Sequence, residues 1–314
     1  MMWKFKAEGM TPPVLSESVV YCGGTDGIYA IDYKTGTLKW KWKLDFSVNA
    51  SPAVCNGTVY VGSLNVLHAL DSRTGEEKWA FQAGNGDVSS PCFDQNTAFF
   101  CCDDGFLYAV DCKKGKAKWR YEAKAPIVSS PAVGNGMVYV VDTEGYLHGV
   151  DIRTGKGIWC LQTGAQWTRT TPAVADGVVY LANHDELYAV DCRTGEVKWL
   201  FDSTEELFSS PAVADGMVYV GGAEEYLYAV DVDNGQLVWK HNSHGWRISP
   251  PAVADGTVYF GNYGGRFYAV DSKTGEEKWM MDCGEDLSET DPVVVDGVIY
   301  LSDYWSVYAL KDGE

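Results

Sequence analysis

The sequence has few positive charges and few histidines for its length. Its 314 residues include 25 Lys and Arg against 43 Asp and Glu, a net charge of −18, and five His. A chain this acidic repels phosphate backbones, so we expect no nucleic-acid partner. Cations or a basic protein surface are better matches, although the charge also has the simpler role of keeping a protein soluble.

Long hydrophobic runs are also missing. No segment approaches the roughly 18 apolar residues of a membrane-spanning helix. The N-terminal sequence MMWKFKAEGM lacks the apolar core of a signal peptide. We therefore expect no membrane span, and a cytoplasmic protein as the sequence is written. The protein would be exported if its N-terminus has been trimmed.

Sequence signatures of common catalytic and metal sites are absent. There is no Gly-x-Ser-x-Gly, P-loop or HExxH motif, and the nine cysteines show neither CxxC spacing nor a disulfide-like framework. Cys101 and Cys102 are adjacent at the end of a predicted strand. Because neighbouring strand residues point to opposite faces, we expect one in the core and one at the surface.

What the sequence has instead is a repeat. Seven times an Ile-Asp, Leu-Asp or Val-Asp pair is followed, eight residues after the Asp, by tryptophan. The copies span 30–40, 69–79, 109–119, 149–159, 189–199, 229–239 and 269–279. A unit of about forty residues cannot bury its own hydrophobic face, so the period predicts a repeat architecture.

Each unit reads as four short strands. A proline opens every unit, at Pro12, Pro52, Pro91, Pro131, Pro172, Pro211, Pro251 and Pro292. In the sixth unit a strand follows the proline, an Asp-Gly turn leads to a second strand at 217–220, a third covers 226–230, and an outer strand at 236–240 carries Trp239. We therefore predict an all-β protein, an eight-bladed β-propeller of four-stranded antiparallel blades formed by 1–314 as one domain.

The eighth unit is incomplete. Residues 291–314 supply three strands and no tryptophan at the repeat position. We expect residues 1–8 to supply the outer strand of this blade, with Trp3 in the role that Trp239 has in its own. This pairing would close the ring and remove the open sheet edges.

The A-x-D-x-x-T-G-x-x-x-W copies resemble the tryptophan-docking motif of the pyrroloquinoline-quinone (PQQ)-type repeat, over essentially the whole chain. The resemblance implies that each repeat tryptophan stacks on the neighbouring blade, where the Thr-Gly turn receives it. Proteins with similar repeats include quinoprotein alcohol dehydrogenases and a lipoprotein subunit of the outer-membrane β-barrel assembly machine. Lys114 and Asn234 replace Thr in two copies and Gly149 replaces Ala in a third, which we expect to affect local packing.

For a quinoprotein dehydrogenase, the resemblance implies PQQ and Ca²⁺ in the central funnel, with a carboxylate as base. The carboxylate and amide candidates are Glu206, Asp286, Glu289, Asn49 and Asn85. Cys101-Cys102 resembles the vicinal disulfide that lies over the cofactor in some of these enzymes. Against this interpretation, the chain is short and lacks the long insertions that enclose the cofactor.

Divergence among the internal copies locates the candidate site. The turns after the first and third strands are near-copies from unit to unit, and they lie on one face. The turns after the second strands and the connections between blades differ from unit to unit, and they lie together on the opposite face. On the diverged face, Trp167 with Arg169 and Trp246 with Arg247 form an aromatic or planar-anion receptor or a protein-interface anchor. His244 and Trp305 complete the predicted binding residues. The alternative is that these side chains plug the channel or pack on loops.

The turns after the second strands are also acidic, and include Asp26, Asp103, Asp104, Asp142, Glu144, Asp185, Glu186, Glu224, Glu225 and Asp303. A ring of carboxylates would attract Ca²⁺ or a basic partner, and a solvated rim is the alternative. Asp103, Asp104, Asp185 and Glu186 are the candidate metal ligands.

These patterns favour a non-catalytic binding or scaffold module that recognises a protein or peptide partner and needs no cofactor. A basic partner suits the acidic loops. The alternative is a quinoprotein-type dehydrogenase, or a propeller that binds a small ligand or metal in its central funnel, with PQQ and Ca²⁺ required only in the dehydrogenase case.

Overall fold

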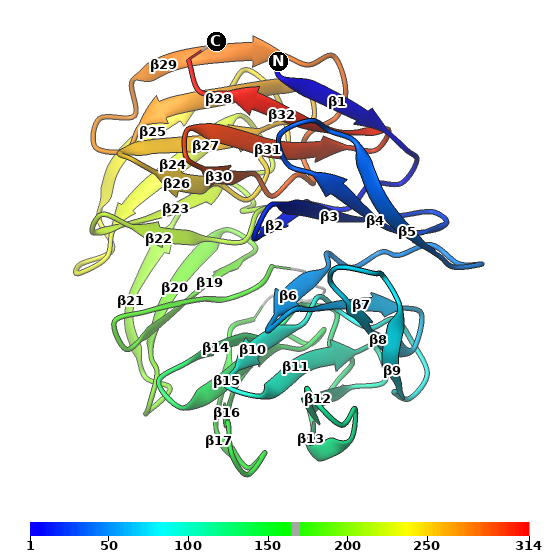
Figure 1. Ribbon diagram of the computed structural model, residues 1–314. Helices are drawn as coiled ribbons and strands as arrows, with labels where there is room; N and C mark the ends of the chain where they lie inside the picture. Colours follow the sequence, from blue (N-terminus) through cyan, green and yellow to red (C-terminus); the bar gives the residue numbers. More distant parts are fainter. Residues whose placement is uncertain (165–169, 314) are drawn as a thin grey trace.

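The computed structural model describes residues 1–164 and 170–313, which form eight four-stranded antiparallel sheets arranged in a ring (Figure 1). The predicted eight-bladed propeller is confirmed. Among these residues there is no helix, and so none that could cross a membrane.

Each blade has a first, second, third and outer strand, counted outward from the axis, and the blades are numbered in chain order. The first strands are β2 (Val14–Ser16), β6 (Ala53–Cys55), β10 (Cys92–Asp94), β14 (Ala132–Gly134), β18 (Ala173–Ala175), β22 (Ala212–Ala214), β26 (Ala252–Ala254) and β30 (Val293–Val295). The second strands are β3 (Val19–Gly24), β7 (Thr58–Ser63), β11 (Thr97–Cys102), β15 (Met137–Val141), β19 (Val178–Asn183), β23 (Met217–Gly221), β27 (Thr257–Gly261) and β31 (Val298–Asp303).

The third strands are β4 (Gly27–Asp32), β8 (Val66–Asp71), β12 (Phe106–Asp111), β16 (Tyr146–Asp151), β20 (Glu186–Asp191), β24 (Tyr226–Asp231), β28 (Arg266–Asp271) and β32 (Ser306–Lys311). The outer strands are β5 (Leu38–Lys43), β9 (Glu77–Gln82), β13 (Ala117–Glu122), β17 (Gly157–Gln162), β21 (Val197–Asp202), β25 (Leu237–Asn242), β29 (Glu277–Asp282) and, in blade eight, β1 (Trp3–Lys6).

The proline that opens the first unit lies one residue later than predicted. In blades two to eight the proline directly precedes the first strand, and in blade one Pro13 has this position rather than Pro12. The hydroxyl of Thr11 accepts a hydrogen bond from the amide of Gly23, 12 residues on, as Ser89 does from Cys101. The duplicated Pro12-Pro13 therefore hid the true register.

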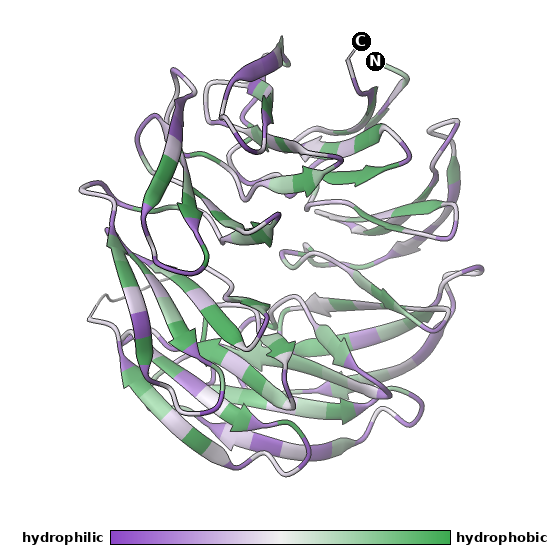
Figure 2. Ribbon diagram, turned by 90° about the vertical axis from the view of Figure 1, so that its left-hand side faces the viewer, coloured by the Kyte–Doolittle hydropathy of each residue, from purple (hydrophilic) through white to green (hydrophobic). Residues whose placement is uncertain are grey.

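The core lies between the blades. Each of its eight hydrophobic clusters is built from two neighbouring blades, including blades eight and one. Second strands are buried on both faces, outer strands on one, and Figure 2 shows hydrophobic residues along the strands and hydrophilic ones in the turns. Cys101 and Cys102 are consequently both buried and both free, in clusters shared with blades four and two respectively. The expected surface position was wrong because a blade inside a ring has no free face.

The repeat tryptophans tie each blade to the next. In blades one to six and in blade eight, the indole N–H donates a hydrogen bond to the carbonyl of the residue after the third-strand Asp of the following blade, at 2.9–3.1 Å. Blade seven differs because the third strand of blade eight ends in Lys311, and Trp279 donates instead to the carboxylate of Asp312 at 3.0 Å. At the other seven junctions the indole also covers the glycine of the turn. At Gly36, which has a φ of 68°, a Cβ would lie 2.8 Å from the ring of Trp3, so only glycine suits both the conformation and the contact. Lys114 and Asn234 keep the turn, since the carboxylates of Asp111 and Asp231 still accept their amides.

The ring closes as predicted. β1 pairs antiparallel with β32, with Trp3 opposite Ala309 and Lys6 opposite Ser306, and the two ends of the chain lie side by side (Figure 1). Strands about 300 residues apart in sequence thus share one sheet.

Candidate functional site

The turns after second strands and the connections between blades meet on one face, which we call the loop face. Their backbones are bonded to one another: the amide of Val48 donates to the carbonyl of Gly24, and the amide of Tyr263 to that of Trp246. The turns after first and third strands form the opposite turn face. There, residues such as Asp215 and Gly216 have positive φ, as the Asp-Gly hairpin signal predicts.

A cavity of about 630 Å³ opens on the loop face where blades eight, one and two meet. Polar and acidic residues from the loops line it, including Thr25, Asn49, Asp87, Asp286, Glu289, Asp303 and Tyr304. The cavity thus brings together Asn49, Asp286 and Glu289, three of the five carboxylate and amide candidates. The other two, Glu206 and Asn85, are exposed and do not line it.

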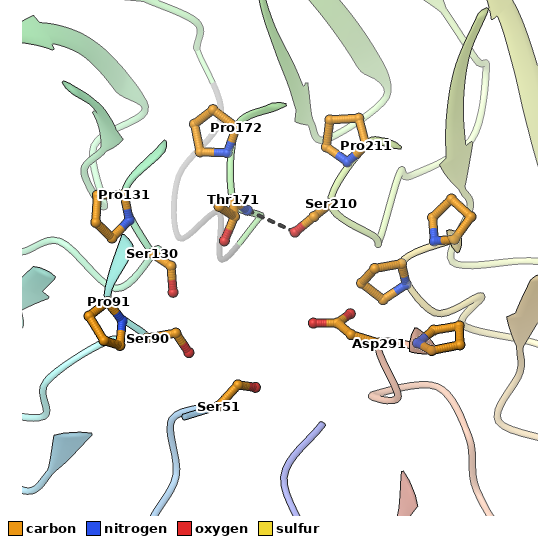
Figure 3. A pocket seen from close by; sticks show the side chains of 13 residues that line it. Ser51, Ser90, Pro91, Ser130, Pro131, Thr171, Pro172, Ser210, Pro211 and Asp291 are labelled. Atoms are coloured by element: carbon orange, nitrogen blue, oxygen red, sulfur yellow. Dashed lines mark hydrogen bonds between the residues drawn. The ribbon is translucent and has the colours of Figure 1, made fainter. Parts of the chain in front are cut away.

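A second cavity, of about 380 Å³, lies at the inner end of the blades (Figure 3). Its wall is formed by the first-strand prolines and the residues before them, among which are Ser51, Ser90, Ser130, Thr171, Ser210 and Asp291. Among the described residues of this lining, Asp291 is the one that carries a charge, and the sequence analysis did not predict it. The sequence does mark this residue, because unit eight has Asp directly before its first-strand proline, where the other units have Ser, Thr or Pro.

A third cavity, of about 210 Å³, lies next to the other two. It shares Asn49 and Asp87 with the first and Ser90 and Ser130 with the second. We call the three together the funnel. Its described lining contains six carboxylates and no Lys, Arg or His; the carboxylates are Asp87, Asp103, Asp286, Glu289, Asp291 and Asp303. A funnel of one sign concentrates field lines and attracts cationic groups.

The protein around the axial cavity changes the acidity of Asp291. Its side chain reaches the solvent in the channel, but the surrounding wall disfavours the charged form and raises the pKa of Asp291 to about 7. The remaining lining residues of that cavity are Ser, Thr and Pro. Hence, within the described residues, no other titratable group faces this carboxylate.

Exposed aromatic side chains gather on the same face. In the described part of the chain five are largely exposed, and all five come from loop-face turns or connections: Phe46, Trp246, Tyr263, Tyr304 and Trp305. They follow the ring from the connection between blades six and seven to that between blades one and two. We call this set the aromatic arc. Large exposed aromatics confined to one face are typical of a protein-binding surface.

Among the predicted binding residues, Trp246 is largely exposed, at 67%. Arg247 and His244 beside it are also exposed, and the guanidinium of Arg247 lies 5.2 Å from the ring centre of Phe208. Trp305 is exposed and packs edge-on against Tyr304, with ring centres 4.8 Å apart. Trp167 and Arg169 lie outside the described residues.

The acidic turns are largely engaged within their own blades. The third strand carries a tyrosine at the same position in six blades, and its hydroxyl donates to a turn carboxylate in blades one, three, five and eight: Tyr29 to Asp26, Tyr108 to Asp104, Tyr188 to Glu186 and Tyr308 to Asp303. Burial is the main cause, and the hydrogen bond to Asp104 the second, of a rise in the pKa of Tyr108 to about 12, so this hydroxyl keeps its proton and stays a donor. These carboxylates therefore act mainly as hydrogen-bond acceptors that fix the turns, rather than as an open ring.

Blade four uses a different pair. His148 replaces the tyrosine, and its Nε2 lies 2.9 Å from Oδ2 of Asp142, with both side chains fully buried. Burial alone would raise the pKa of Asp142, but the hydrogen bonds from His148 and from the amide of Tyr146 outweigh it and hold that pKa below its usual value. Asp142, expected in an exposed ring, is thus a buried structural residue.

The candidate metal ligands are divided between two blades. Asp103 and Asp104 belong to blade three, and Asp185 and Glu186 to blade five. In residues 1–164 and 170–313 no group of three or more His, Cys, Asp or Glu side chains is placed to hold a metal ion. Nor does the described lining fit PQQ, because the quinone carries carboxylates and the funnel presents carboxylates to it.

The whole chain matches a family model described as outer membrane protein assembly factor BamB, over residues 1–90, 65–171, 144–247 and 223–314. Among solved structures, BamB from Moraxella catarrhalis is 16% identical with a TM-score of 0.83, each chain covered to 98%. The computationally designed protein Ika8 is 19% identical with a TM-score of 0.86, covering 97% of this chain and 96% of its own.

Quinohemoprotein alcohol dehydrogenase ADHIIG from Pseudomonas putida HK5 is also similar. It is 16% identical with a TM-score of 0.80, and the match covers 99% of this chain and 76% of the dehydrogenase. No curated protein matches the chain by sequence. At these identities the structural likenesses show the shared propeller fold.

Proposed function

Because this chain belongs to the BamB family of PQQ-like repeat propellers, we propose that it is a non-catalytic module that binds a protein partner through its loop face. The observation that carries the proposal is the aromatic arc beside the acidic funnel. Aromatic anchors supply most of the binding energy of typical protein interfaces, and complementary charge supplies orientation and association rate. A partner segment that combines basic and apolar residues fits both features.

The two exposed tryptophans of the arc provide the test. Trp246→Ala together with Trp305→Ala should lower the affinity for the partner at least about tenfold, since truncating an interface anchor typically costs about 2 kcal/mol. The partner is first captured from extracts of the source organism on immobilised protein and identified by mass spectrometry. Its affinity is then measured with both proteins purified.

The matched control removes exposed apolar side chains elsewhere. Leu200 and Val238 lie exposed on the outer strands β21 and β25, away from the loop face. Leu200→Ala with Val238→Ala should leave the affinity unchanged. Equal binding by the wild-type protein and the tryptophan double variant would contradict the assignment of the loop face.

A second prediction concerns the quinone. Titration of the purified protein with PQQ, with and without Ca²⁺, should give no saturable quenching of tryptophan fluorescence, because the acidic funnel repels an anionic ligand. An apo quinoprotein dehydrogenase serves as the positive control. Saturable, Ca²⁺-dependent quenching that disappears on mutation of Trp246 or Arg247 would instead support the dehydrogenase interpretation.

A further inference from the structure

The residues before the first-strand prolines form a polar collar around the axial cavity. Alternation along the chain turns two consecutive side chains in opposite directions. In blade three the hydroxyl of Ser89 accepts the amide of Cys101 within the blade, while Ser90 lines the cavity. The collar residues, labelled in Figure 3, are Ser51, Ser90, Ser130, Thr171, Ser210 and Asp291.

The collar has more acceptors than the protein uses. The hydroxyl of Ser210 accepts the amide of Thr171 at 2.9 Å. In the described part of the chain, neither the carboxylate of Asp291 nor the hydroxyls of Ser51 and Ser130 have a protein hydrogen-bond partner. In Figure 3 these oxygen atoms point into the shared space at the axis. The described residues of the collar therefore present oxygen atoms, one carboxylate among them, that can accept hydrogen bonds from a ligand.

The chemistry of this set selects the ligand. One carboxylate balances one positive charge, whereas Ca²⁺ prefers several carboxylates in its oxygen shell. A primary ammonium is a compact cation whose N–H donors point in several directions, which suits a carboxylate on one side and hydroxyls around the rest. A planar guanidinium presents its donors in a single plane and suits the collar less well. The cavity of about 380 Å³ has room for an alkylammonium chain with ordered water.

We propose that the axial collar receives a lysine side chain of the bound partner, with its ammonium group on Asp291 and the neighbouring hydroxyls. This inference rests on the proposed function and specifies what enters the funnel. The funnel's other carboxylates would draw the lysine inward, and the aromatic arc would hold the apolar residues that flank it.

The first experiment needs no partner. N-acetyl-lysine N-methylamide is titrated into the protein at pH 8 and followed by protein-observed NMR, with the norleucine and arginine analogues in parallel. Saturable binding of the lysine compound is expected, with Asp291→Asn binding it at least about tenfold more weakly. Asp233→Asn removes the same charge from an exposed turn-face position and should bind as the wild type does. Equal binding by Asp291→Asn, or equal binding of the norleucine or arginine compound, would overturn the proposal.

The acidity of the collar supplies an independent readout. The pKa of Asp291, raised to about 7 by the enclosing wall, means that the carboxylate is protonated as the pH falls below neutrality. A neutral acid does not pair with an ammonium group, so wild-type affinity for the lysine compound should fall about tenfold between pH 8 and pH 6. Asp291→Asn should show no such dependence. A pH-independent wild-type affinity would contradict the role of Asp291.

Binding measurements with the purified partner then distinguish the proposed loop-face function from the lysine inference. A purified partner that binds Asp291→Asn about tenfold more weakly than Asp233→Asn supports insertion of its lysine. If the partner binds both variants equally but loses affinity for the tryptophan double variant, the loop-face function stands and the lysine inference fails. If the lysine compound binds through Asp291 but the partner does not use the loop face, the proposed function fails and the ammonium site remains.

Discussion

Deletion of residues 1–8 is expected to destroy the stable monomeric ring. The deletion removes β1, leaves the edge of β32 unpaired and removes the indole of Trp3 from the junction of blades eight and one. An unpaired strand edge is a template for association with other chains. Size-exclusion chromatography with light scattering should therefore show oligomers or aggregates, and thermal unfolding should begin at a much lower temperature.

Trp3→Ala isolates the side-chain part of this effect. Trp3 is 9% exposed, donates its indole N–H to the carbonyl of Tyr33 at 2.9 Å and packs with Tyr300. Truncation of a buried Trp typically costs about 3–5 kcal/mol. We expect a loss of that size in the free energy of unfolding, measured by urea denaturation followed by fluorescence.

The same substitution at an exposed tryptophan is the control. Trp246→Ala should change the free energy of unfolding by less than about 0.5 kcal/mol, because its side chain is largely in solvent. Closure by β1 would be wrong if the deletion variant remained monomeric with an unchanged melting temperature.

Asp142→Ala is expected to destabilise the protein by about 3 kcal/mol or more, because it removes the shared acceptor of several hydrogen bonds, and each donor left unsatisfied costs about 1–3 kcal/mol. The carboxylate accepts hydrogen bonds from His148 and from the amides of Glu144 and Tyr146. Without it, the buried His148 and the two partly buried amides lose their acceptor. Asp142→Asn retains an amide oxygen that can accept hydrogen bonds, and should lose less.

Glu144→Ala provides a control two residues away. Glu144 is exposed, so its removal should have an effect within about 0.5 kcal/mol. The sign of the pH dependence follows from the lowered pKa of Asp142: the stabilisation is present above the usual range of an aspartate and is lost as the pH falls through the folded-state pKa. The difference between wild type and Asp142→Ala should therefore narrow in strong acid. Equal stability of the Asp142→Ala and Glu144→Ala variants would contradict the role of the pair.

The features that could be predicted from the sequence are those that recur in every repeat unit. Strand order, the Asp-Gly turns and the closing role of Trp3 follow from patterns that recur in each unit, and the structure contains them. The positions at which one unit differs from the others were harder to interpret from the sequence. Asp142 reads like its exposed acidic neighbours, and only the histidine at 148, where six blades have tyrosine, marks it as buried.

The candidate site was predicted less completely, for a physical reason. The loop face and its exposed Trp246 and Trp305 could be located because divergence concentrates there. Which loops meet over the axis depends on ring curvature and loop conformation, which no local pattern encodes. The grouping of Asn49, Asp286 and Glu289, and the position of Asp291 in the channel, therefore became visible only in three dimensions.

The pairing of β1 with β32 has a consequence for how the chain can be cut. Because the amide of Met2 donates to the carbonyl of Ala309, the first and last strands are already neighbours in one sheet. The N- and C-terminal strands thus belong to the same blade, so the break in the chain falls within blade eight rather than between two blades. A circular permutant, with the old ends joined by a short linker and new ends opened in a connection between blades, would make every blade from one continuous segment. The first and last blades of such a chain would be held together only by contacts between blades, and no strand pairing would join its ends.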